Sequence, residues 1–311
     1  FHMTMTNPTR RALLAGAAAL PAAGLLGRAT PVRAAAPMMG AATARFNRVK
    51  LGGFEVTTLL AGTRTVPEPH NIFGLNASDD EFAAASSAAM IPTDKAQFFF
   101  TPTLVNTGAE VILFDTGLNP EGITAAVTAA GYTPDQIDKV VITHMHGDHI
   151  GGLMGDSATF ANAAYVTGQA EFDHWAAAGN DGFDSKVRPL ADKMTFVGDG
   201  GAAASGVTAM AAFGHTPGHM AYMLESDGQQ MVLGADFANH YVWSLAHPEW
   251  EVKFDMDKSA AAATRTRLLD MMATEKLPFV GYHMPFPALG YVDRRDGGYR
   301  YVPASYQLMM D

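Results

Sequence analysis

Apolar and polar positions along the chain predict alternating strands and helices after about residue 45. Short apolar runs bounded by turn residues predict strands, and the first two flank Gly52 and Gly53, as expected of a hairpin. The predicted strands cover residues 49–51, 54–60, 98–105, 111–114, 139–143, 164–167, 195–197, 207–212, 221–225, 230–233 and 278–282. Helices are expected after the capping box that begins at Ser78, and over 122–130, 171–178 and 258–276, while the rest of 61–97 is expected to be irregular. The pattern predicts a mixed α/β fold.

The first 36 residues have a different pattern. Arg10 and Arg11 precede an apolar run over 12–26, which small residues follow at 32–36. This order predicts a secretory signal of the twin-arginine type and a periplasmic or secreted protein. Pro21 interrupts the run, which is shorter than the roughly 20 residues that span a bilayer, so no stable membrane anchor is expected. Phe1 and His2, ahead of Met3, are interpreted as additions to the native chain.

Composition and charge narrow the classes of function. The chain has 311 residues, 48% of them hydrophobic, and it contains no cysteine, which excludes disulfides, thiolate metal sites and a thiol nucleophile. Residues 1–36 hold four arginines and no acid, so residues 37–311 carry 17 basic and 31 acidic side chains, a formal charge of −14. A surface that acidic repels phosphate backbones, so no nucleic-acid partner is expected. Residues 37–311 are predicted to form a single domain because no linker or repeat divides them.

Candidate chemistry is concentrated in the run from Thr143 to His149. Its sequence, Thr-His-Met-His-Gly-Asp-His, follows an apolar strand directly and holds three imidazoles and one carboxylate. His144 and His146 are two apart in extended chain and project to the same side, while a turn at Gly147 brings Asp148 and His149 towards a second point nearby. Titratable groups this close must be solvated, paired or bound to metal. The run therefore predicts two adjacent metal ions.

Further ligands are expected where later apolar strands end. His219 lies in a loop with Pro217, Asp236 follows the strand that ends at Ala235, and His283 follows Tyr282. His215, in the same loop as His219, is interpreted as a supporting group rather than as a ligand.

The motif His-x-His-x-Asp-His, followed by His, Asp and His at strand ends, resembles the metallo-β-lactamase superfamily from about residue 50 to the C-terminus. This resemblance implies a four-layer αβ/βα sandwich with a two-metal site on one edge. It implies one divalent ion on His144, His146 and His219, another on Asp148, His149 and His283, and Asp236 as the bridge between them. A shared water or hydroxide would be the nucleophile, with Asp148 and Asp236 as the catalytic carboxylates. The ions are expected to be zinc, with manganese, cobalt or iron as alternatives.

Within this superfamily, the chain is most similar to the methyl parathion hydrolase branch, through the segments 247–250, 254–257 and 281–287. That resemblance implies a hydrolase of lactones, esters or organophosphate triesters, small apolar or aryl substrates, and a homodimer. Six residues are expected to line the substrate pocket: Arg64, Phe98, Phe100, Phe172, Trp175 and Phe183. Three alternatives stay open: a glyoxalase II-like thioesterase, a sulfur-oxidising enzyme with one iron, and a non-catalytic metal-binding protein.

Overall fold

The computed structural model describes residues 36–295 and 297–310, and Thr43–Asp311 form one compact unit. Apart from Ala36, the export signal predicted over residues 1–36 lies outside the described residues, so it stays a prediction. In the described part of the chain, no helix has the length and apolar character needed to cross a membrane.

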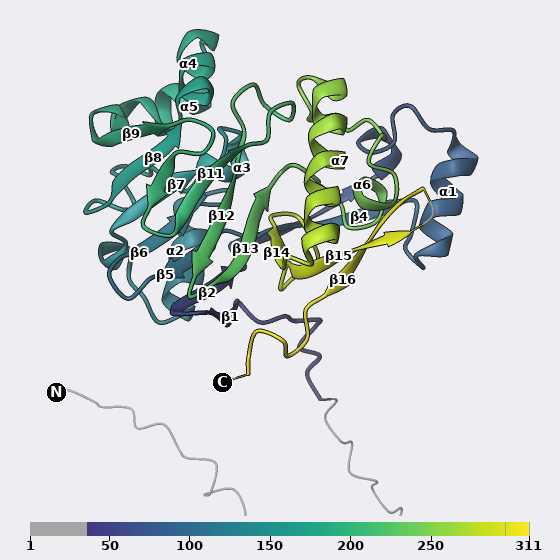
Figure 1. Ribbon diagram of the computed structural model, residues 1–311, viewed down its shortest axis with the longest axis horizontal. Helices are drawn as coiled ribbons and strands as arrows, with labels where there is room; N and C mark the ends of the chain where they lie inside the picture. The colour runs from purple at the N-terminus through teal and green to yellow at the C-terminus, as the bar shows by residue number, and fades with distance from the viewer. Residues whose placement is uncertain (1–35, 296, 311) are drawn as a thin grey trace, which may run out of the picture. The chain divides into compact units, whose positions relative to one another are not determined.

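Two seven-stranded sheets and a two-stranded hairpin make up the β-structure (Figure 1). The first sheet has the order β1 (Phe46–Leu51), β2 (Phe54–Leu59), β5 (Thr103–Asn106), β6 (Val111–Phe114), β7 (Lys139–Ile142), β8 (Ala164–Gly168) and β9 (Met194–Val197). The second has the order β10 (Ala202–Ala204), β11 (Val207–Ala211), β12 (Met220–Ser226), β13 (Gln229–Ala235), β14 (Phe279–Gly281), β15 (Leu289–Arg295) and β16 (Gly298–Pro303). The hairpin pairs β3 (Gly62–Pro67) with β4 (Lys95–Phe100).

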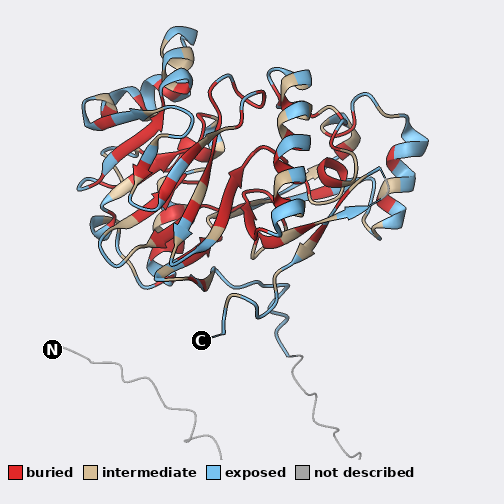
Figure 2. Ribbon diagram, viewed as in Figure 1, coloured by how far each residue is buried: buried red, intermediate tan, exposed pale blue. Residues whose placement is uncertain are grey.

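Helices pack on the outer face of each sheet and beside the hairpin. They are α1 (Asp79–Ala88), α2 (Pro120–Ala129), α3 (Gly147–Ile150), α4 (Gln169–Ala178), α5 (Asp181–Lys186), α6 (Trp243–Ala246) and α7 (Lys258–Glu275), with short 3-10 turns at Pro69–Asn71, Pro134–Gln136 and Arg188–Lys193. In Figure 1, α7 crosses the face of the second sheet, and α4 and α5 lie beside β8 and β9. In Figure 2 the strands are largely buried, whereas α7 is exposed along its outer side.

Alternation along the central strands divides the apolar side chains between two cores. In β6, Ile112 and Phe114 face the core shared with the second sheet, and Leu113 faces the core under α2. Helix α7 buries Leu268, Leu269 and Met272, at helical spacing, against the second sheet. The result is helix, sheet, sheet and helix in succession, which confirms the expected αβ/βα sandwich.

The segment before residue 106 differs from its prediction. The strand expected over 98–105 is two strands, because the chain breaks at Thr101 and Pro102 and passes from β4 in the hairpin to β5 in the first sheet. Pro102 has no N–H to donate to a continuous ladder. The segment expected to be irregular contains β3. This strand has little buried surface, so its polar sequence Gly-Thr-Arg-Thr lacks the apolar alternation that predicts a strand.

A buried histidine makes stability depend on pH. Nδ1 of His240 accepts hydrogen bonds from the backbone N–H of Val242 and Trp243, and burial lowers the pKa of His240 to about 3. Between this value and about 6.5 the unfolded chain binds a proton that the folded chain does not, so the free energy of unfolding falls as the pH falls through this window. We expect a shift from pH 7.5 to pH 5 to destabilise the wild type by about 2 kcal/mol more than His240→Asn, whose side-chain oxygen can accept the same hydrogen bonds. Urea denaturation of both proteins at both pH values tests this, and an equal loss in the two proteins would contradict it.

Candidate metal centre

The candidate ligands meet at one edge of the sandwich because two pairs of parallel strands end there. Strands β6 and β7 are parallel neighbours in the first sheet, and β13 and β14 are parallel neighbours in the second. Polar residues follow the carboxyl ends of all four: Asp115 after β6, the 143–149 run after β7, Asp236 after β13 and His283 after β14. Asp115 and Ala235 adopt positive φ angles of 59° and 49°, which turn the chain sharply where the carboxylates emerge.

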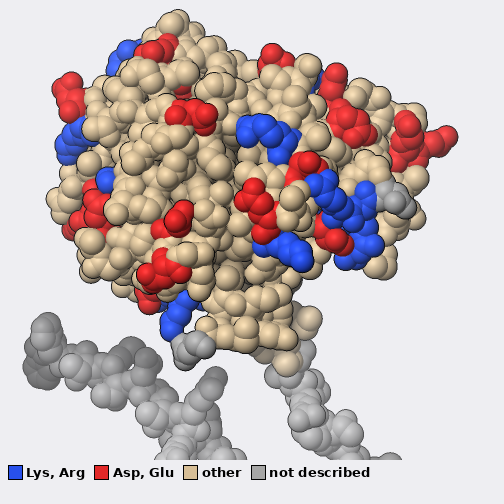
Figure 3. Space-filling model, in the orientation of Figure 1, with Lys and Arg blue, Asp and Glu red and all other residues tan. Residues whose placement is uncertain are grey.

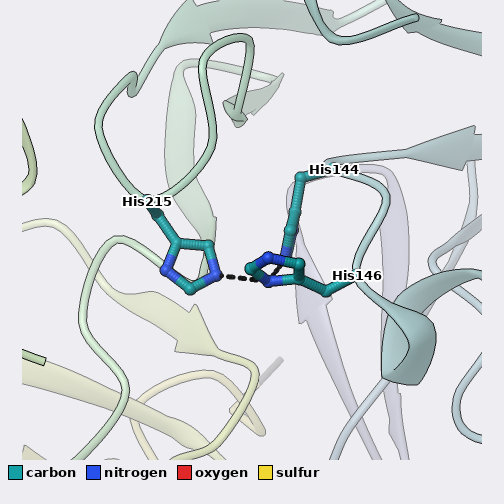
Figure 4. Close-up of side chains that lie close together, drawn as sticks. All are labelled: His144, His146 and His215. Carbon is teal, nitrogen blue, oxygen red and sulfur yellow. Dashed lines mark hydrogen bonds between the residues drawn. The ribbon is translucent and has the colours of Figure 1, made fainter. Parts of the chain in front are cut away.

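One group of nitrogen atoms comes from His144, His146 and His215. His144 Nε2 lies 3.2 Å from His146 Nδ1, which lies 3.0 Å from His215 Nε2. In Figure 4 the three rings converge from two loops, and their nitrogen atoms face one another. These three imidazoles form a compact set of donors for a metal ion.

A second group comprises Asp148, His149 and His283. Oδ2 of Asp148 lies 3.7 Å from His149 Nε2 and 3.3 Å from His283 Nε2. Asp148 and His149 belong to the one-turn helix α3, which begins after His146, and the His149 ring lies beside that of His144 with centroids 4.0 Å apart.

The Asp236 carboxylate lies between the two groups. Its Oδ2 is 3.3 Å from His215 Nε2, 3.9 Å from His144 Nε2 and 3.2 Å from His283 Nε2. Its Oδ1 is 3.2 Å from His149 Nε2. The carboxylate is therefore placed to contact cations in both groups.

The donor set fits divalent cations. His149 Nε2 and Asp236 Oδ1 are buried and lie 3.2 Å apart, but neither makes a hydrogen bond within the described part of the chain. Buried polar atoms rarely remain without a partner, and their surroundings here consist of imidazole nitrogens and carboxylate oxygens, which zinc and similar ions prefer. Two ions on these atoms would satisfy the unpaired groups.

Electrostatics keep both carboxylates ionised. Burial alone would raise the pKa of Asp236, but the charges of His283 and His149 outweigh burial and hold the pKa well below its usual value. Burial likewise acts to raise the pKa of Asp148, and the same two histidines lower it to about 2. The carboxylates are thus available as ligands at neutral pH.

The imidazoles fall into two classes. Burial, reinforced by neighbouring imidazoles, lowers the pKa of His144 well below its usual value and that of His146 to about 4. For His149, His215 and His283 burial acts in the same direction, but nearby carboxylates outweigh it and raise the pKa, to about 9 for His215 and about 10 for His283. A metal ion must displace the protons on these three rings, so its binding competes with protonation.

The structure places His215, and not His219, with the other donors. Nε2 of His219 lies 3.1 Å from the backbone nitrogen of Asp236, whose N–H it accepts, and Nδ1 lies 3.1 Å from the carbonyl oxygen of Ala212. Both nitrogens of His219 are therefore engaged by the backbone, and the ring belongs to neither group above. The structure thus groups His215 with His144 and His146, while His219, whose ring centroid lies 4.9 Å from that of His144, stays a predicted ligand.

Asp115 supports the 143–149 run. Its Oδ2 lies 2.9 Å from His149 Nδ1 and accepts a hydrogen bond from the hydroxyl of Thr143, while Oδ1 accepts from the backbone N–H of Thr143. A carboxylate on Nδ1 fixes the tautomer of the ring and leaves Nε2 free to ligate.

Asp255 and Arg265 support His215 in the same way. Asp255 Oδ1 lies 2.8 Å from His215 Nδ1, and Oδ2 accepts a hydrogen bond of 2.7 Å from Arg265. Arg265, fully buried in α7, also donates to the carbonyl oxygens of Phe237, Pro248 and Trp250. The charge on Asp255 is thus compensated by a guanidinium that is itself fully hydrogen-bonded.

Glu171 joins the two loops that carry the first group. Its Oε1 accepts from the backbone N–H of Met145 and from the indole of Trp175, and Oε2 accepts from the hydroxyl of Thr216 and the N–H of Gly218. A Cβ at residue 218 would lie 2.0 Å from the Glu171 nitrogen, so only glycine permits this approach. The buried carboxylate therefore fixes the 143–149 run relative to the loop at 214–219.

A cavity of about 410 Å³ opens onto the cluster. His146, Gly147, Asp148, Asp236 and His283 form one side of it. The remaining lining residues are mostly apolar: Arg64, Val66, Ile72, Phe98, Phe100, Leu118 and Phe254. Of the six expected pocket residues, Arg64, Phe98 and Phe100 thus border the cavity.

Phe172, Trp175 and Phe183 do not border this cavity and are corrected here. Phe183 is fully buried, and Phe172 packs against it and Phe196 in the core of the first sheet. Trp175 is turned towards Glu171 by its indole hydrogen bond. Its ring also lies edge-on to that of His146, with centroids 5.9 Å apart, so Trp175 borders the metal centre without lining the cavity, whereas Phe172 and Phe183 pack with core residues.

Asp115, Glu171, Asp255 and Arg265 were not identified from the sequence. Asp115 carries the same signal as Asp236, a carboxylate directly after an apolar strand, and could have been found by that rule. Nothing in the local sequence distinguishes the other three, because their partners, apart from Trp175 beside Glu171, lie 10 to 47 residues away.

Two solved structures have a fold similar to that of this chain. A structure of a hydrolase, AbOPH, described as in the beta lactamase superfamily, matches with a TM-score of 0.80 and 23% identity over 86% of this chain and 100% of the other. AidC, described as a dizinc quorum-quenching lactonase in complex with a product, matches with a TM-score of 0.77 and 23% identity over 84% of this chain and 98% of AidC. At these identities the two structures support the fold alone.

Curated relatives match shorter segments. An N-acyl homoserine lactonase of Bacillus cereus is 25% identical over 51% of this chain and 61% of its own length. A ribonuclease Z of Prochlorococcus marinus is 47% identical over 18% of this chain and 17% of its own length. This chain thus spans less than two thirds of either relative.

The model of the metallo-beta-lactamase superfamily matches residues 101–283, more than half of the chain and the segment that holds every donor described above. The chain belongs to the metallo-beta-lactamase superfamily.

Proposed function

We propose that this protein is a two-metal hydrolase that opens lactones and cleaves related esters and organophosphate triesters. The observation that carries the proposal is the position of Asp236 and its surrounding histidines in the wall of a largely apolar cavity. The proposed ligands are His144, His146 and His215 for one ion and Asp148, His149 and His283 for the other, with Asp236 between them.

Hydrolysis is the reaction class that suits this donor set. The imidazoles and carboxylates of both groups would hold two divalent ions, which would supply Lewis-acid chemistry and make water a better nucleophile at neutral pH. Asp115 and Asp255 hold the rings of His149 and His215 in their ligating orientation. Asp148, whose side chain is 24% exposed beside the cavity, is placed to take a proton from the attacking water and return it to the leaving oxygen.

The cavity favours small substrates with an apolar body. Phe98, Phe100 and Phe254 offer aromatic contact, and Arg64 is the one cation among the lining residues. Arg64 makes no side-chain hydrogen bond or ion pair within the part of the chain that the structure describes, so it is free to hold a carbonyl or phosphoryl oxygen away from the reacting bond. Lactonase relatives and the resemblance of 281–287 to the methyl parathion hydrolase branch support this substrate class. That branch also supports a homodimer.

Nucleic acid is the less favoured substrate although ribonuclease Z is among the relatives. The matched segment is short, and residues 37–311 carry a net charge of −14. On the face drawn in Figure 3, basic side chains lie among acidic ones. Arg294 pairs with Asp270, and Arg295 and Arg300 pair with Asp293, so these arginines present no continuous basic surface for phosphates.

Turnover assays test the proposal. We expect the zinc-loaded protein to hydrolyse an aryl lactone, N-hexanoyl homoserine lactone or a paraoxon-type triester, and we expect a chelator to abolish this turnover until zinc is returned. S-lactoylglutathione tests the thioesterase alternative, and oxygen uptake with a persulfide tests the sulfur-oxidising one. Turnover of the lactone at an unchanged rate by metal-free protein would contradict the proposal, and so would preference for either alternative substrate.

A further inference from the structure

A second cavity, of about 490 Å³, lies on the other face of the β3–β4 hairpin. Side chains in strands alternate between faces, and the register pairs Arg64 with Phe98 and Thr65 with Gln97. The first pair lines the cavity at the metal centre, and the second pair lines the second cavity. The volume lies in the range of small-molecule sites, roughly 300–1,000 Å³.

The walls of the second cavity are mainly apolar and carry no negative charge. Ile91, Pro92, Phe99, Trp243 and Pro285 supply apolar surface, and the lining residues include no aspartate or glutamate. Phe99 belongs to the hairpin, whereas Trp243 begins α6 and Pro285 follows β14. Three separate segments thus enclose the space.

A buried imidazole in this wall has an unused N–H. His240 is only 7% exposed, and its Nδ1 accepts two backbone hydrogen bonds, so the ring proton resides on Nε2. Within the part of the chain that the structure describes, no group accepts a hydrogen bond from Nε2. The ring stacks on Trp243 with centroids 3.9 Å apart, which fixes the direction of this N–H.

Two further donors in the same wall are also unused. Lys95, the one lysine or arginine of the lining, makes no side-chain ion pair or hydrogen bond among the described residues, and neither does the hydroxyl of Tyr241. A neutral N–H, a hydroxyl and one ammonium around apolar walls match a ligand with several acceptor atoms, a single negative charge and an apolar body. A carboxylate has this chemistry, whereas a phosphate monoester would bring a second charge that no cation here balances.

We propose that the second cavity binds a small monocarboxylic acid, with its carboxylate at Lys95, Tyr241 and His240 and its apolar body against Phe99 and Trp243. The binding determinants lie outside the metal ligands, so the proposal does not depend on the reaction. His283 borders both cavities, and its Nδ1 lies 2.9 Å from the carbonyl oxygen of Phe99. A ligand in the second cavity would therefore contact the side of a metal-centre residue that faces away from the first cavity.

Calorimetric titration of the zinc-loaded protein with 4-phenylbutyrate tests the proposal. A carboxylate could also bind at the metal centre, so the variants compare the two faces of the hairpin. We expect Lys95→Ala and Tyr241→Phe each to weaken binding about five-fold, as expected for one exposed charge pair or one hydrogen bond. Arg64→Ala, which removes the cation of the first cavity, is the matched control and is expected to leave the affinity within about two-fold. 4-Phenylbutanol, which lacks the charge, is expected to bind more weakly than the acid.

Three results would overturn the proposal. The first is no binding of 4-phenylbutyrate at millimolar concentration. The second is weakened binding in Arg64→Ala with unchanged binding in Lys95→Ala, which would place the acid at the metal centre. The third is equal affinity for the acid and the alcohol, which would show that the donors do not bind the carboxylate in preference to a hydroxyl. Lys95 and Tyr241 are not core residues, so a folding defect is not expected to obscure these results, and circular dichroism of each variant checks this.

Discussion

Asp236→Asn is expected to lower the metal content from two ions to at most one and kcat/KM by roughly 10³-fold. Asp236 approaches imidazole nitrogens of both groups, at 3.2 to 3.9 Å, so loss of its charge affects both ions. Metal ions contribute several kcal/mol to transition-state stabilisation, and each 1.36 kcal/mol corresponds to about a factor of ten in rate. Elemental analysis and lactone turnover measure the two effects.

Asp293→Asn is the matched control. Asp293 is a surface carboxylate in β15 that pairs with Arg295 and Arg300, and it lies outside the cavity of the metal centre. This variant is expected to keep both ions and full turnover. Two retained ions and normal turnover in Asp236→Asn would show that the carboxylate does not link the groups.

Glu171→Gln is expected to weaken metal binding by about 10- to 100-fold and to destabilise the metal-free protein. The carboxylate accepts four hydrogen bonds, and an amide in its place would point its NH₂ at two of the four donors. Two buried donors without acceptors cost roughly 2–6 kcal/mol, at about 1–3 kcal/mol each. Changes in residues that orient ligands commonly reduce metal affinity by 10- to 100-fold. Zinc titration against a competing chelator and urea denaturation measure the two effects.

Trp175→Phe is the control that separates alignment of the two loops by Glu171 from the loss of any single hydrogen bond to it. It removes one donor to Glu171 and leaves the carboxylate with three partners, so both effects are expected to be small. A Glu171→Gln protein that binds zinc as tightly as Trp175→Phe would exclude a role for this carboxylate in aligning the loops.

The position of the metal centre could be predicted because its signals are local. Residues 143–149 hold four donors directly after a strand, and Asp236 and His283 also follow apolar strands. Parallel strands bring their carboxyl ends to the same edge, so these positions could be expected to meet. The layers of the fold were predictable for the same reason, since alternation in strands such as β6 assigns each face to a core.

The grouping of His215 with His144 and His146 could not be predicted from local sequence. His215 and His219 lie in one loop with Pro217 and Gly218, four residues apart. The outcome depends on distant partners: the backbone of Asp236 and Ala212 engages His219, while Asp255 and Glu171 fix the loop so that His215 faces His146.

The hairpin and half of the expected pocket residues were predicted wrongly for a related reason. The β3–β4 hairpin pairs residues some 30 positions apart, and β3 has few apolar residues to mark it. Its Arg64 and Phe98 face the metal centre only because of that register. Phe172 and Phe183 are aromatic, as pocket residues often are, but in helices α4 and α5 their side chains pack with the core.

The central claim is that seven side chains, from the segments after β7, β13 and β14 and the loop between β11 and β12, hold two divalent ions. Anomalous scattering at the zinc edge from crystals of the zinc-loaded protein tests it most directly. The account predicts two peaks, one coordinated by His144, His146 and His215 and the other by Asp148, His149 and His283, with the Asp236 carboxylate reaching both. A single peak, or a peak coordinated by His219 in place of His215, would contradict it.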